Sequence, residues 1–338
     1  MAARVAINGL GRIGRATLRA LLEERGLELV AVNDVAPADN LAYLLRYDTV
    51  YGRLPDEISA ADSALSVGGH TIRVLNEKDP ARLPWGDLDV DVVFECTGVF
   101  RTREDVDRHR RAGARRVILS APAKGDMTTV VYGVNQGDGV GVEVVSCASC
   151  TTNCIAPVVE ILDRHVGVRK ATMTTVHAYT SSQQLVDGPA RKWRRGRAAA
   201  ANTVPTTTGA AEATAKAVPA MEGRFDGVAL RVPVPVGSIA DVVCVTSRPT
   251  TVDEINDIFR EEAAGDRYRD VLGVNEEPIV SGDILGDRRA SVVDATLTTV
   301  TDGDLVKVMA WYDNEWGYAQ QMVRHALATV GEPVPSGR

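Results

Sequence analysis

The sequence predicts a two-domain α/β protein, with a first domain of parallel βαβ units and an α+β second domain built on a mixed or antiparallel sheet. Its 338 residues exceed the ~100–200 residues of a typical single domain. Up to about residue 150, short apolar runs alternate with helical patterns, which is typical of parallel βαβ units. Beyond that point the strand-like runs become longer and rich in valine and threonine, and they alternate in places.

Four short apolar runs in the first domain are expected to form buried strands. They span residues 5–8, 27–33, 91–96 and 116–119. A helix is predicted between the first two runs, because Leu18, Leu21 and Leu22 recur at i, i+3 and i+4 and so share one face. Strands that are joined in this way by helices pair in parallel within one sheet.

The second domain is expected to combine longer strands with helices on one face of their sheet. The predicted strands span residues 171–179, 228–236, 239–247 and 305–312, and the predicted helices span 151–162 and 253–264. We therefore place the first domain at residues 1–150 and the second at residues 151–314. A last helical stretch, 320–329, lies in a C-terminal segment, 315–338, that we expect to return to the first domain.

The composition is that of a soluble globular protein, with 45% apolar and 25% charged residues. No uncharged apolar run approaches the ~18–20 residues that span a bilayer, and the first residues lack the apolar core of a signal peptide. A formal net charge of -7 argues against a general nucleic-acid or membrane partner. The five cysteines, an odd number, indicate reduced thiols, so we expect a cytoplasmic protein.

A glycine-rich turn follows the first predicted strand and opens the first predicted helix. It reads GLGRIG over residues 9–14, the G-x-G-x-x-G pattern of a Rossmann dinucleotide site, although such a turn can also be purely structural. Glycines let the backbone approach a pyrophosphate, which the N–H groups at the helix start then bind. Asp34 ends the second strand and can accept hydrogen bonds from a ribose 2′-hydroxyl. Because it would repel a 2′-phosphate and no basic residue follows it at positions 35–37, the sequence favours NAD over NADP.

Three of the five cysteines lie within the segment SCASCTTNC (146–154). The spacing C-x-x-C-x-x-x-C allows a metal or iron–sulfur site, and its C-x-x-C part allows a redox pair. We favour a third interpretation, in which Cys150 is a nucleophile at the N-terminus of the helix predicted over 151–162. The positive end of that helix is expected to lower the thiol pKa. Cys154, one turn further on, would then be structural, as would Cys244.

A nucleophilic cysteine needs a base, and His177 is the best placed of the five histidines. It follows the strand-like run 172–176 and stands just before the polar loop 180–182. A histidine at a strand end beside a loop is well placed for proton transfer. His70 and His109 are expected in polar or charged surroundings of the first domain, where this chemistry gives them no role.

Six segments that are spread over the chain share one resemblance. They are NGLGRIGR (8–15), SCASCTTNC (146–154), TTVHAYT (174–180), RRGRAAAANTVPTTTGAA (194–211), LRVPVP (230–235) and WYDNEWGY (311–318). Together they resemble the phosphorylating glyceraldehyde-3-phosphate dehydrogenase family in its order and spacing. The resemblance implies a glycolytic or gluconeogenic, NAD-dependent oxidoreductase with a Rossmann domain and a catalytic domain. It also implies a cytoplasmic homotetramer without a dedicated nucleic-acid or membrane partner.

By the same resemblance, D-glyceraldehyde 3-phosphate is oxidised to 1,3-bisphosphoglycerate through a thiohemiacetal and a thioester on Cys150, and His177 takes up the proton. Two anion sites are implied as well. The residues that match the inorganic-phosphate site are Ser149, Thr151, Thr208 and Gly209, and those that match the substrate-phosphate site are Thr180, Ser182 and Arg231, with Arg195 nearby. Even without the resemblance, Arg231 stands out within an apolar run, because an unpaired buried charge is costly.

The resemblance also assigns residues to each part of the cofactor. They are Gly9, Gly11, Arg12 and Ile13 in the pyrophosphate turn, Asp34 on the adenosine ribose, Lys78 near the adenine, Thr97, Gly98 and Ser120 at the cofactor edge, and Asn314 on the nicotinamide carboxamide with Tyr318 close by. No metal is implied.

Three departures from the family pattern lie near the predicted site. Cys147 stands where the family usually has asparagine, Cys96 where serine is common, and the loop 181–184 differs from the usual one. Cys147 motivates the hypothesis of a reversible Cys147–Cys150 disulfide under oxidation. The alternative functions are an erythrose-4-phosphate dehydrogenase, an inhibitor-tolerant duplicate enzyme, and a non-enzymatic binder that uses the cysteines or the basic segment 191–197. Thr208 and Gly209, which match the inorganic-phosphate site, favour D-glyceraldehyde 3-phosphate over erythrose 4-phosphate as the substrate.

Overall fold

The computed structural model describes residues 2–61 and 63–330, which divide into two compact units. Of the described chain, unit 1 comprises residues 2–130 (62 aside), 136–148 and 322–330, and unit 2 comprises residues 131–135 and 149–321. Residues 331–338 of the segment expected to return to the first domain lie outside the described residues.

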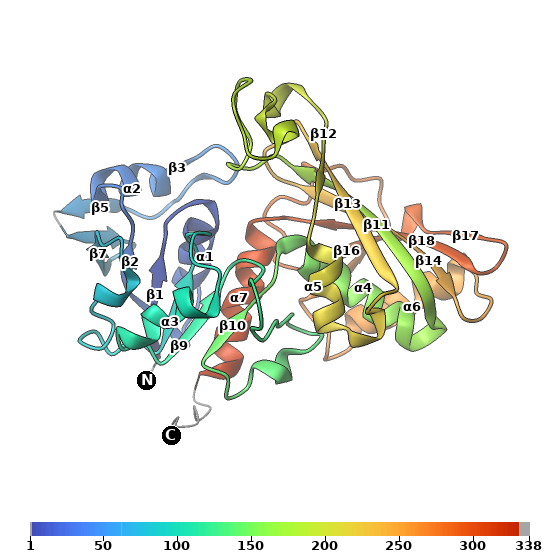
Figure 1. Cartoon of the computed structure of the whole chain (residues 1–338), viewed down its shortest axis with the longest axis horizontal. Helices are drawn as coiled ribbons and strands as arrows, with labels where there is room; N and C mark the ends of the chain where they lie inside the picture. Colours follow the sequence, from blue (N-terminus) through green and yellow to red (C-terminus); the bar gives the residue numbers. More distant parts are fainter. Residues whose placement is uncertain (1, 62, 331–338) are drawn as a thin grey trace. The chain divides into compact units, whose positions relative to one another are not determined.

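Unit 1 is built on a largely parallel sheet with the strand order β10-β9-β8-β1-β2-β7-β6-β5 (Figure 1). The strands from β10 to β7 pair in parallel, and β6 and β5 extend the sheet antiparallel. In chain order they are β1 (Ala3–Asn8), β2 (Leu27–Asn33), β5 (Ile58–Ala61), β6 (Ala64–Val67), β7 (His70–Leu75), β8 (Val92–Glu95), β9 (Arg116–Leu119) and β10 (Val144–Ser146). A separate small ribbon joins β3 (Tyr47–Asp48) and β4 (Gly52–Arg53).

The strand order of unit 1 determines where a ligand can bind. β1 lies inside the sheet, with β2 on one side and β8 on the other. In open parallel sheets, ligands bind beyond the carboxyl ends of the strands where the strand order reverses in this way. The glycine-rich turn follows β1 at this point and leads into α1 (Arg12–Leu22), which buries Leu18 and Leu21. The predicted Rossmann arrangement of the first domain is confirmed.

Two helices of unit 1 were absent from the sequence prediction, α2 (Ala38–Arg46) and α3 (Arg103–Arg111). The α3 sequence is so rich in charge that it shows no apolar stripe, but its start is capped. The Thr102 hydroxyl accepts a hydrogen bond from the Asp105 N–H, and the Asp105 carboxylate accepts one from the Thr102 N–H. The buried residues of α3 are Val106 and His109. His109 is fully buried, and its immediate surroundings are polar and charged as expected, because its ring contacts the Glu95 carboxylate and the Trp85 indole nitrogen.

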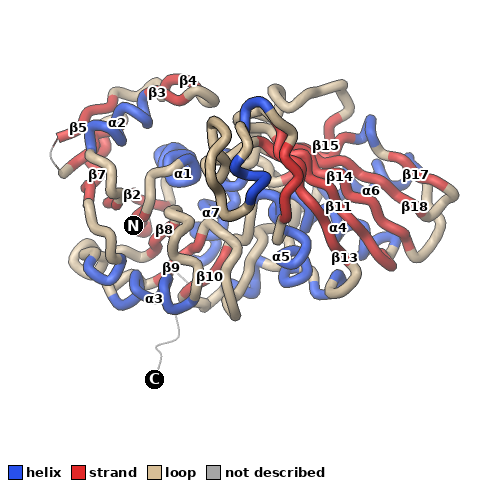
Figure 2. Tube along the Cα trace, turned by 45° about the horizontal axis from the view of Figure 1, so that its top comes forward, coloured by secondary structure: helices blue, strands red, loops and turns tan. Residues whose placement is uncertain are grey.

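Unit 2 is built on a mixed sheet with the order β12-β13-β11-β14-β18-β16-β15, with β17 paired to β18. Figure 2 shows its central strands side by side, and α4, α5 and α6 pack on one face. The strands are β11 (Val168–Ala178), β12 (Val204–Thr207), β13 (Phe225–Val232), β14 (Ser238–Thr246), β15 (Leu272–Asn275), β16 (Ser291–Asp294), β17 (Thr299–Thr301) and β18 (Leu305–Tyr312). The helices are α4 (Cys150–Val166), α5 (Ala210–Ala217), α6 (Val252–Ala264) and α7 (Trp316–Thr329), whose residues 316–321 belong to unit 2 and 322–329 to unit 1.

Several predicted boundaries of unit 2 differ from the structure for identifiable reasons. The strand expected over 228–236 ends at Val232, because Pro233 and Pro235 have no N–H for the sheet. Helix α4 runs four residues beyond the predicted end and stops at Gly167, whose φ of 68° favours glycine. Short 3₁₀ turns occupy Pro80–Arg82, Gln136–Gly139, Trp193–Gly196, Ala199–Ala201, Pro219–Met221 and Ala295–Leu297. Within the described part of the chain, no helix has the length and apolar character to cross a membrane.

Candidate active site

Cys150 is the first residue of α4, the long buried helix of unit 2. Ser149 caps this helix, since its hydroxyl accepts a hydrogen bond of 3.1 Å from the Thr152 N–H. The N–H groups of the first helical turn have no acceptor within the helix and carry a partial positive charge. A negative charge that develops near Cys150 is therefore stabilised by the helix start.

His177 lies near the end of β11 with its side chain next to this thiol. The distance from Cys150 Sγ to His177 Nε2 is 3.4 Å, and His177 Nδ1 lies 2.7 Å from the Ala178 carbonyl oxygen. A carbonyl oxygen accepts only, so Nδ1 carries the proton and donates it there. In the neutral ring, Nε2 then has a free lone pair that accepts the hydrogen bond from the thiol. This tautomer prepares His177 to take the proton of Cys150.

The expected lowering of the Cys150 pKa is wrong for this structure. Burial raises the pKa of the thiol above its ordinary value, and the opposing effects of Arg231 and of the donors at the helix start are smaller. Burial likewise lowers the pKa of His177 to about 3, and the charge of Arg231 adds to the effect. The resting pair is therefore a neutral thiol beside a neutral imidazole, an arrangement in which the thiol proton can pass to His177.

Tyr312, at the end of β18, is a residue of this site that the sequence analysis did not single out. Its ring meets the His177 ring edge-on, with 5.9 Å between the centroids. Its buried hydroxyl lies 2.9 Å from the Thr151 hydroxyl and 2.8 Å from the Thr175 hydroxyl. The three hydroxyls join β18, α4 and β11 around the histidine. The sequence could have indicated Tyr312, because it is an aromatic residue of a predicted strand and stands two positions before Asn314.

Asn314 follows β18 and has a fixed side-chain orientation. Its Oδ1 accepts hydrogen bonds from the Ser238 hydroxyl (2.9 Å) and the Gly237 N–H (3.2 Å). The Ser238 hydroxyl also accepts one from the Ala178 N–H at 3.1 Å, next to His177. The amide NH₂ of Asn314 is left to bind a carbonyl oxygen, which fits the role expected on a nicotinamide carboxamide. Tyr318, expected nearby, is a buried residue of α7.

Four predicted substrate-phosphate residues are linked in one hydrogen-bonded group. Arg231 lies opposite His177 in the β11–β13 register, and its guanidinium donates to the Thr180 hydroxyl at 3.1 Å. The Thr180 and Ser182 hydroxyls are 2.8 Å apart, and Arg195 donates to Ser182 at 3.4 Å.

The same group has the electrostatics of an anion site. Among the described residues, neither arginine pairs with a carboxylate, and Arg231 Nε is buried without a hydrogen-bond partner. Burial lowers the pKa of Arg231, because no nearby anion compensates the desolvated cation. A phosphate would supply both the missing acceptor and the missing charge.

The predicted inorganic-phosphate residues occupy two helix starts and do not form one hydrogen-bonded group. Ser149 and Thr151 flank Cys150 at the start of α4, and their hydroxyls contact Thr152 and Tyr312. Thr208 and Gly209 precede α5, where the Thr208 hydroxyl accepts the Ala210 N–H at 3.1 Å. Helices α4 and α5 pack against each other.

A cavity of about 390 Å³ lies at the carboxyl ends of the unit 1 strands. Five predicted cofactor residues line it: Gly9, Gly11, Asp34, Lys78 and Thr97. Cys96, expected near the cofactor, lines it as well. The Asp34 carboxylate is held by the Leu10 N–H at 2.7 Å and the Ala36 N–H at 2.9 Å. These bonds leave acceptor capacity on both oxygens for ribose hydroxyls.

The local structure requires two of the three glycines of the turn, Gly9 and Gly14. Gly9 has a φ of 93°, and a Cβ at Gly14 would lie 1.9 Å from the Gly9 carbonyl oxygen. At Gly11, by contrast, no protein atom lies within 4 Å of where a Cβ would be. The space beside Gly11 is thus open toward the cavity, next to the uncapped start of α1. The turn therefore fits a dinucleotide pyrophosphate.

The four other predicted cofactor residues of unit 1 do not line this cavity. They are Arg12, Ile13, Gly98 and Ser120. Arg12 and Ile13 open α1, and the Arg12 guanidinium forms an ion pair with Asp48. Ser120 hydrogen-bonds the Cys96 thiol, and Gly98 follows Thr97 with a φ of 70°. These residues belong to unit 1, around the cavity rather than within it.

The remaining thiols are protonated at neutral pH. Burial raises the pKa to about 12 for Cys96, Cys147, Cys154 and Cys244. Cys154 Sγ lies 3.6 Å from the Ser291 hydroxyl and 3.7 Å from the Ala310 carbonyl, whereas Cys150 contacts His177. Within the described residues, no group of three or more potential ligands is arranged to hold a metal ion. A buried thiol such as Cys147 is also a poor attacking group for a disulfide.

A cysteine paired with a histidine suits covalent capture of an aldehyde, and a dinucleotide cavity suits the removal of hydride. A chain with both belongs to the class of cysteine-dependent, nicotinamide-linked dehydrogenases. Comparison with known families narrows this class. Residues 3–103 match the family described as "Glyceraldehyde 3-phosphate dehydrogenase, NAD binding domain", and residues 149–314 match its "C-terminal domain".

Curated relatives match over nearly their whole length. Glyceraldehyde-3-phosphate dehydrogenase of Streptomyces coelicolor is 49% identical over 96% of this chain and 97% of its own. Glyceraldehyde-3-phosphate dehydrogenase of Clostridium acetobutylicum is 48% identical over 95% of this chain and 97% of its own. Glyceraldehyde-3-phosphate dehydrogenase 1 of Bacillus subtilis is 47% identical, with 96% and 97% covered. The chain belongs to the glyceraldehyde-3-phosphate dehydrogenase family, and its cofactor is NAD.

Proposed function

We propose that this chain oxidises D-glyceraldehyde 3-phosphate to 1,3-bisphosphoglycerate, with NAD and inorganic phosphate, in glycolysis or gluconeogenesis. One observation above all supports the proposal. The Cys150–His177 pair has a tautomer suited to proton transfer, and Arg231 places an uncompensated cation on the strand beside it. An aldehyde that also carries a phosphate matches this combination.

In the proposed reaction, the Cys150 sulfur attacks the aldehyde carbon while His177 Nε2 takes up the thiol proton. The Cys150 N–H at the start of α4 stabilises the negative charge on the aldehyde oxygen. His177 returns the proton to that oxygen to complete the thiohemiacetal and accepts it again as hydride leaves. NAD, when bound, supplies the hydride acceptor. The resulting thioester on Cys150 is cleaved by phosphate, which yields the acyl phosphate and frees the sulfur.

The two anions of this reaction are assigned to different residues. Arg231, Thr180, Ser182 and Arg195 hold the substrate phosphate, as their hydrogen-bonded group and its unpaired positive charge suggest. The attacking phosphate is assigned to Ser149, Thr151, Thr208 and Gly209. The packing of α4 against α5 supports this second assignment, since each helix start offers N–H donors.

The cavity of unit 1 supports five of the cofactor assignments, those of Gly9, Gly11, Asp34, Lys78 and Thr97. Gly9, Gly11, Arg12 and Ile13 bind the pyrophosphate, Asp34 the ribose, and Lys78, Thr97, Gly98 and Ser120 the adenosine side and edge. Asn314, with Tyr318, holds the nicotinamide carboxamide. The carboxylate of Asp34 in the cavity supports NAD over NADP, because a 2′-phosphate would meet a negative charge there.

We further propose a cytoplasmic homotetramer and a domain division at 1–150 and 151–314, with 315–338 returning to the first domain. The two compact units support the division. The exposed apolar side chains of Leu185, Val186 and Trp193 support assembly, because such a cluster on one loop favours burial against another subunit. Sedimentation should then give about 145 kDa, four chains of 36.2 kDa each.

A panel of aldehydes tests the substrate. Formation of NADH is measured with glyceraldehyde 3-phosphate, erythrose 4-phosphate and unphosphorylated glyceraldehyde, each with NAD or NADP and with phosphate. We expect the highest kcat/KM for glyceraldehyde 3-phosphate with NAD. A higher kcat/KM for erythrose 4-phosphate, or for the unphosphorylated aldehyde, would contradict the proposal.

A further inference from the structure

A buried polar network borders the cofactor cavity of unit 1 and takes no part in the chemistry proposed above. At its centre, Glu95 ends β8 and faces His109 of α3, with 2.9 Å between Oε2 and Nε2. Both side chains are fully buried. Such a pair invites the interpretation of a buried salt bridge, but the neighbouring Trp85 determines its charge state.

Trp85 fixes the tautomer of His109. The Trp85 indole nitrogen lies 2.9 Å from His109 Nδ1. An indole N–H can only donate, so Nδ1 accepts and has no proton. The imidazole is therefore neutral, and its single N–H, on Nε2, donates to Glu95. The histidine supplies a hydrogen bond to the carboxylate but no positive charge.

Within the described part of the chain, every partner of the Glu95 carboxylate is a hydrogen-bond donor. Asn8 Nδ2 donates to Oε2 at 2.5 Å, beside the His109 N–H. The Thr97 N–H donates to Oε1 at 2.8 Å, and the Thr97 hydroxyl donates to the same oxygen. A set made up entirely of donors fits an ionised carboxylate. Burying a charge without a counter-cation costs free energy of folding, so packing alone does not explain a carboxylate at this position.

The residues that Glu95 holds form the walls of the cavity. Asn8 and Thr97 both line it, on the ends of neighbouring parallel strands. Thr97 also packs against the glycine turn, since a Cβ at Gly9 would lie 2.8 Å from the Thr97 nitrogen. Asn8 Oδ1 in turn accepts a hydrogen bond of 2.6 Å from Asn33, which is also a cavity residue. One carboxylate thus fixes both sides of the turn that binds the dinucleotide.

We propose that Glu95 and His109 are positioning residues of the dinucleotide site. The charge of Glu95 holds Thr97 and Asn8 in the geometry that receives the cofactor, and the tautomer imposed by Trp85 keeps His109 as a donor to that charge. The inference rests on the proposed NAD-dependent function, because it concerns the same cavity. Neither residue touches the cofactor in this role, so their substitution acts on cofactor binding through other residues.

Calorimetric titration of the full-length protein with NAD tests the proposal. Glu95→Gln keeps the shape but places an amide NH₂ among donors, and His109→Leu removes the donor to Glu95. We expect each to raise the NAD Kd about 10-fold or more, because Glu95→Gln replaces the charge by an amide whose NH₂ faces other donors, and His109→Leu takes a hydrogen bond away from the buried charge. His109→Gln, whose amide can donate in place of Nε2–H, should stay within about threefold of the wild type. Alkylation of Cys150 by iodoacetamide should be unchanged in all three.

The matched control is Val106→Ala, which loosens the packing of α3 without removing a hydrogen bond. It should lower Tm and leave the NAD Kd unchanged. The proposal is overturned if Glu95→Gln and His109→Leu bind NAD like the wild type, or if Val106→Ala weakens NAD binding as much as they do. If Glu95→Gln does not fold, the NAD Kd values of His109→Leu and His109→Gln decide. A higher Kd for His109→Leu than for His109→Gln supports the proposal, and equal values overturn it. A wild-type protein that binds NAD but does not oxidise the aldehyde would refute the proposed function and leave this inference standing.

Discussion

Two opposing effects act on the thiol of Cys150. The start of α4 and the charge of Arg231 favour a thiolate, whereas burial disfavours it, and burial is the larger effect. Burial is also the largest effect on the imidazole of His177, where it lowers the pKa to about 3 and the charge of Arg231 acts in the same direction. Before substrate binds, the two groups therefore do not form an ion pair. The proton stays on the Cys150 sulfur, and the His177 ring is neutral. An anion bound at Arg231 would remove part of the charge that lowers the His177 pKa.

The pH dependence of alkylation follows from this balance. Because burial raises the folded-state pKa of Cys150, we expect its alkylation by iodoacetamide to accelerate through pH 8 and to continue rising near pH 9. The Cys150→Ser variant corrects for the other thiols, whose pKa values of about 12 make them unreactive in this range. A rate that reached its plateau below pH 7 would instead indicate a resting thiolate–imidazolium pair.

Arg231 should matter for phosphorylated substrates far more than for the thiol itself. Arg231→Leu removes the fork that donates to Thr180 and the buried cation at the anion site. We expect kcat/KM for glyceraldehyde 3-phosphate to fall about 100-fold or more, with the loss much smaller for unphosphorylated glyceraldehyde. Arg224→Leu, which removes an exposed arginine just before the same strand, is the control and should change neither value greatly. Equal losses for both aldehydes would remove Arg231 from the phosphate site.

Single residues differ in how far the sequence reveals them. Cys150 and His177 could be predicted because a helix start and a strand end leave marks in the local sequence. The buried position of His109 could not, because α3 is almost entirely charged and its burial depends on Trp85 and Glu95 from elsewhere in the chain. The direction of the Cys150 pKa shift could not be predicted either. It depends on desolvation, and desolvation depends on tertiary packing around the thiol rather than on the local sequence.

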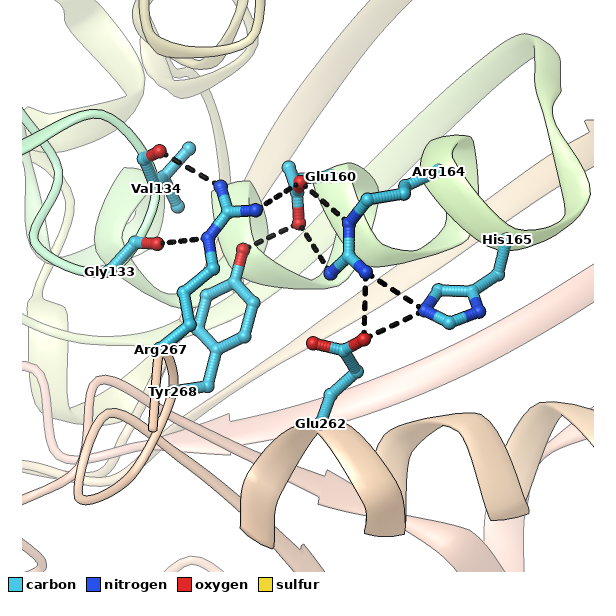
Figure 3. A network of polar contacts seen from close by, with 8 residues as sticks. All are labelled: Gly133, Val134, Glu160, Arg164, His165, Glu262, Arg267 and Tyr268. Atoms are coloured by element: carbon cyan, nitrogen blue, oxygen red, sulfur yellow. Dashed lines mark hydrogen bonds and ion pairs between the residues drawn. The ribbon is translucent and has the colours of Figure 1, made fainter. Parts of the chain in front are cut away.

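At the scale of elements, helix α4 carries the proposed nucleophile, Cys150, at its start and is held near its other end by charged side chains (Figure 3). Arg164 pairs with Glu160 one turn earlier, at 3.0 Å, and with Glu262 of α6, at 2.8 Å. Arg267 and the Tyr268 hydroxyl also contact Glu160, at 2.9 Å and 2.6 Å. This network joins α4, α6 and the segment that follows α6, so it fixes the helix whose start carries Cys150.

Acid should weaken this network in a defined pH range. The hydrogen bond from Arg164, supported by one from His165, lowers the pKa of Glu262 from 4.5 to about 2. A folded-state pKa below the unfolded value gives stability that is complete above pH 4.5 and is lost as the pH falls toward 2. We expect Glu262→Gln to lower the free energy of unfolding by about 1 kcal/mol at pH 7, since water partly screens the pair. The deficit should shrink between pH 5 and pH 3 in urea titrations.

Asp257→Asn on the same helix is the control for this measurement. Asp257 pairs with Arg260 on the exposed side of α6, with 66% of its side chain exposed, so its loss should change stability by about 0.5 kcal/mol or less. A deficit for Glu262→Gln that stayed constant from pH 7 to pH 3 would show that its charge does not provide the stabilisation.

For the whole molecule, the fold class was accessible from the sequence because periodicity separates the two kinds of sheet. Short buried runs between helices indicated the parallel sheet of unit 1, and longer runs indicated the mixed sheet of unit 2. The strands β5 to β7 were not predicted, since they are only 4 to 6 residues long, and the helix α5 was not predicted, since its alanine-rich sequence shows no clear apolar stripe. Strand order was also inaccessible, because it depends on long-range pairing such as that of β1 with β8.

In the proposed mechanism, an acyl group passes from Cys150 to phosphate after the cofactor bound by unit 1 has accepted hydride. A rapid-mixing experiment is the most direct test of this transfer. The protein is mixed with NAD and glyceraldehyde 3-phosphate in phosphate-free buffer, and NADH absorbance is followed before and after phosphate is added. We expect a burst that stops near one NADH per chain, because the thioester accumulates on Cys150, and renewed turnover when phosphate is added. Sustained turnover without phosphate, or a burst that persists in Cys150→Ser, would contradict the mechanism.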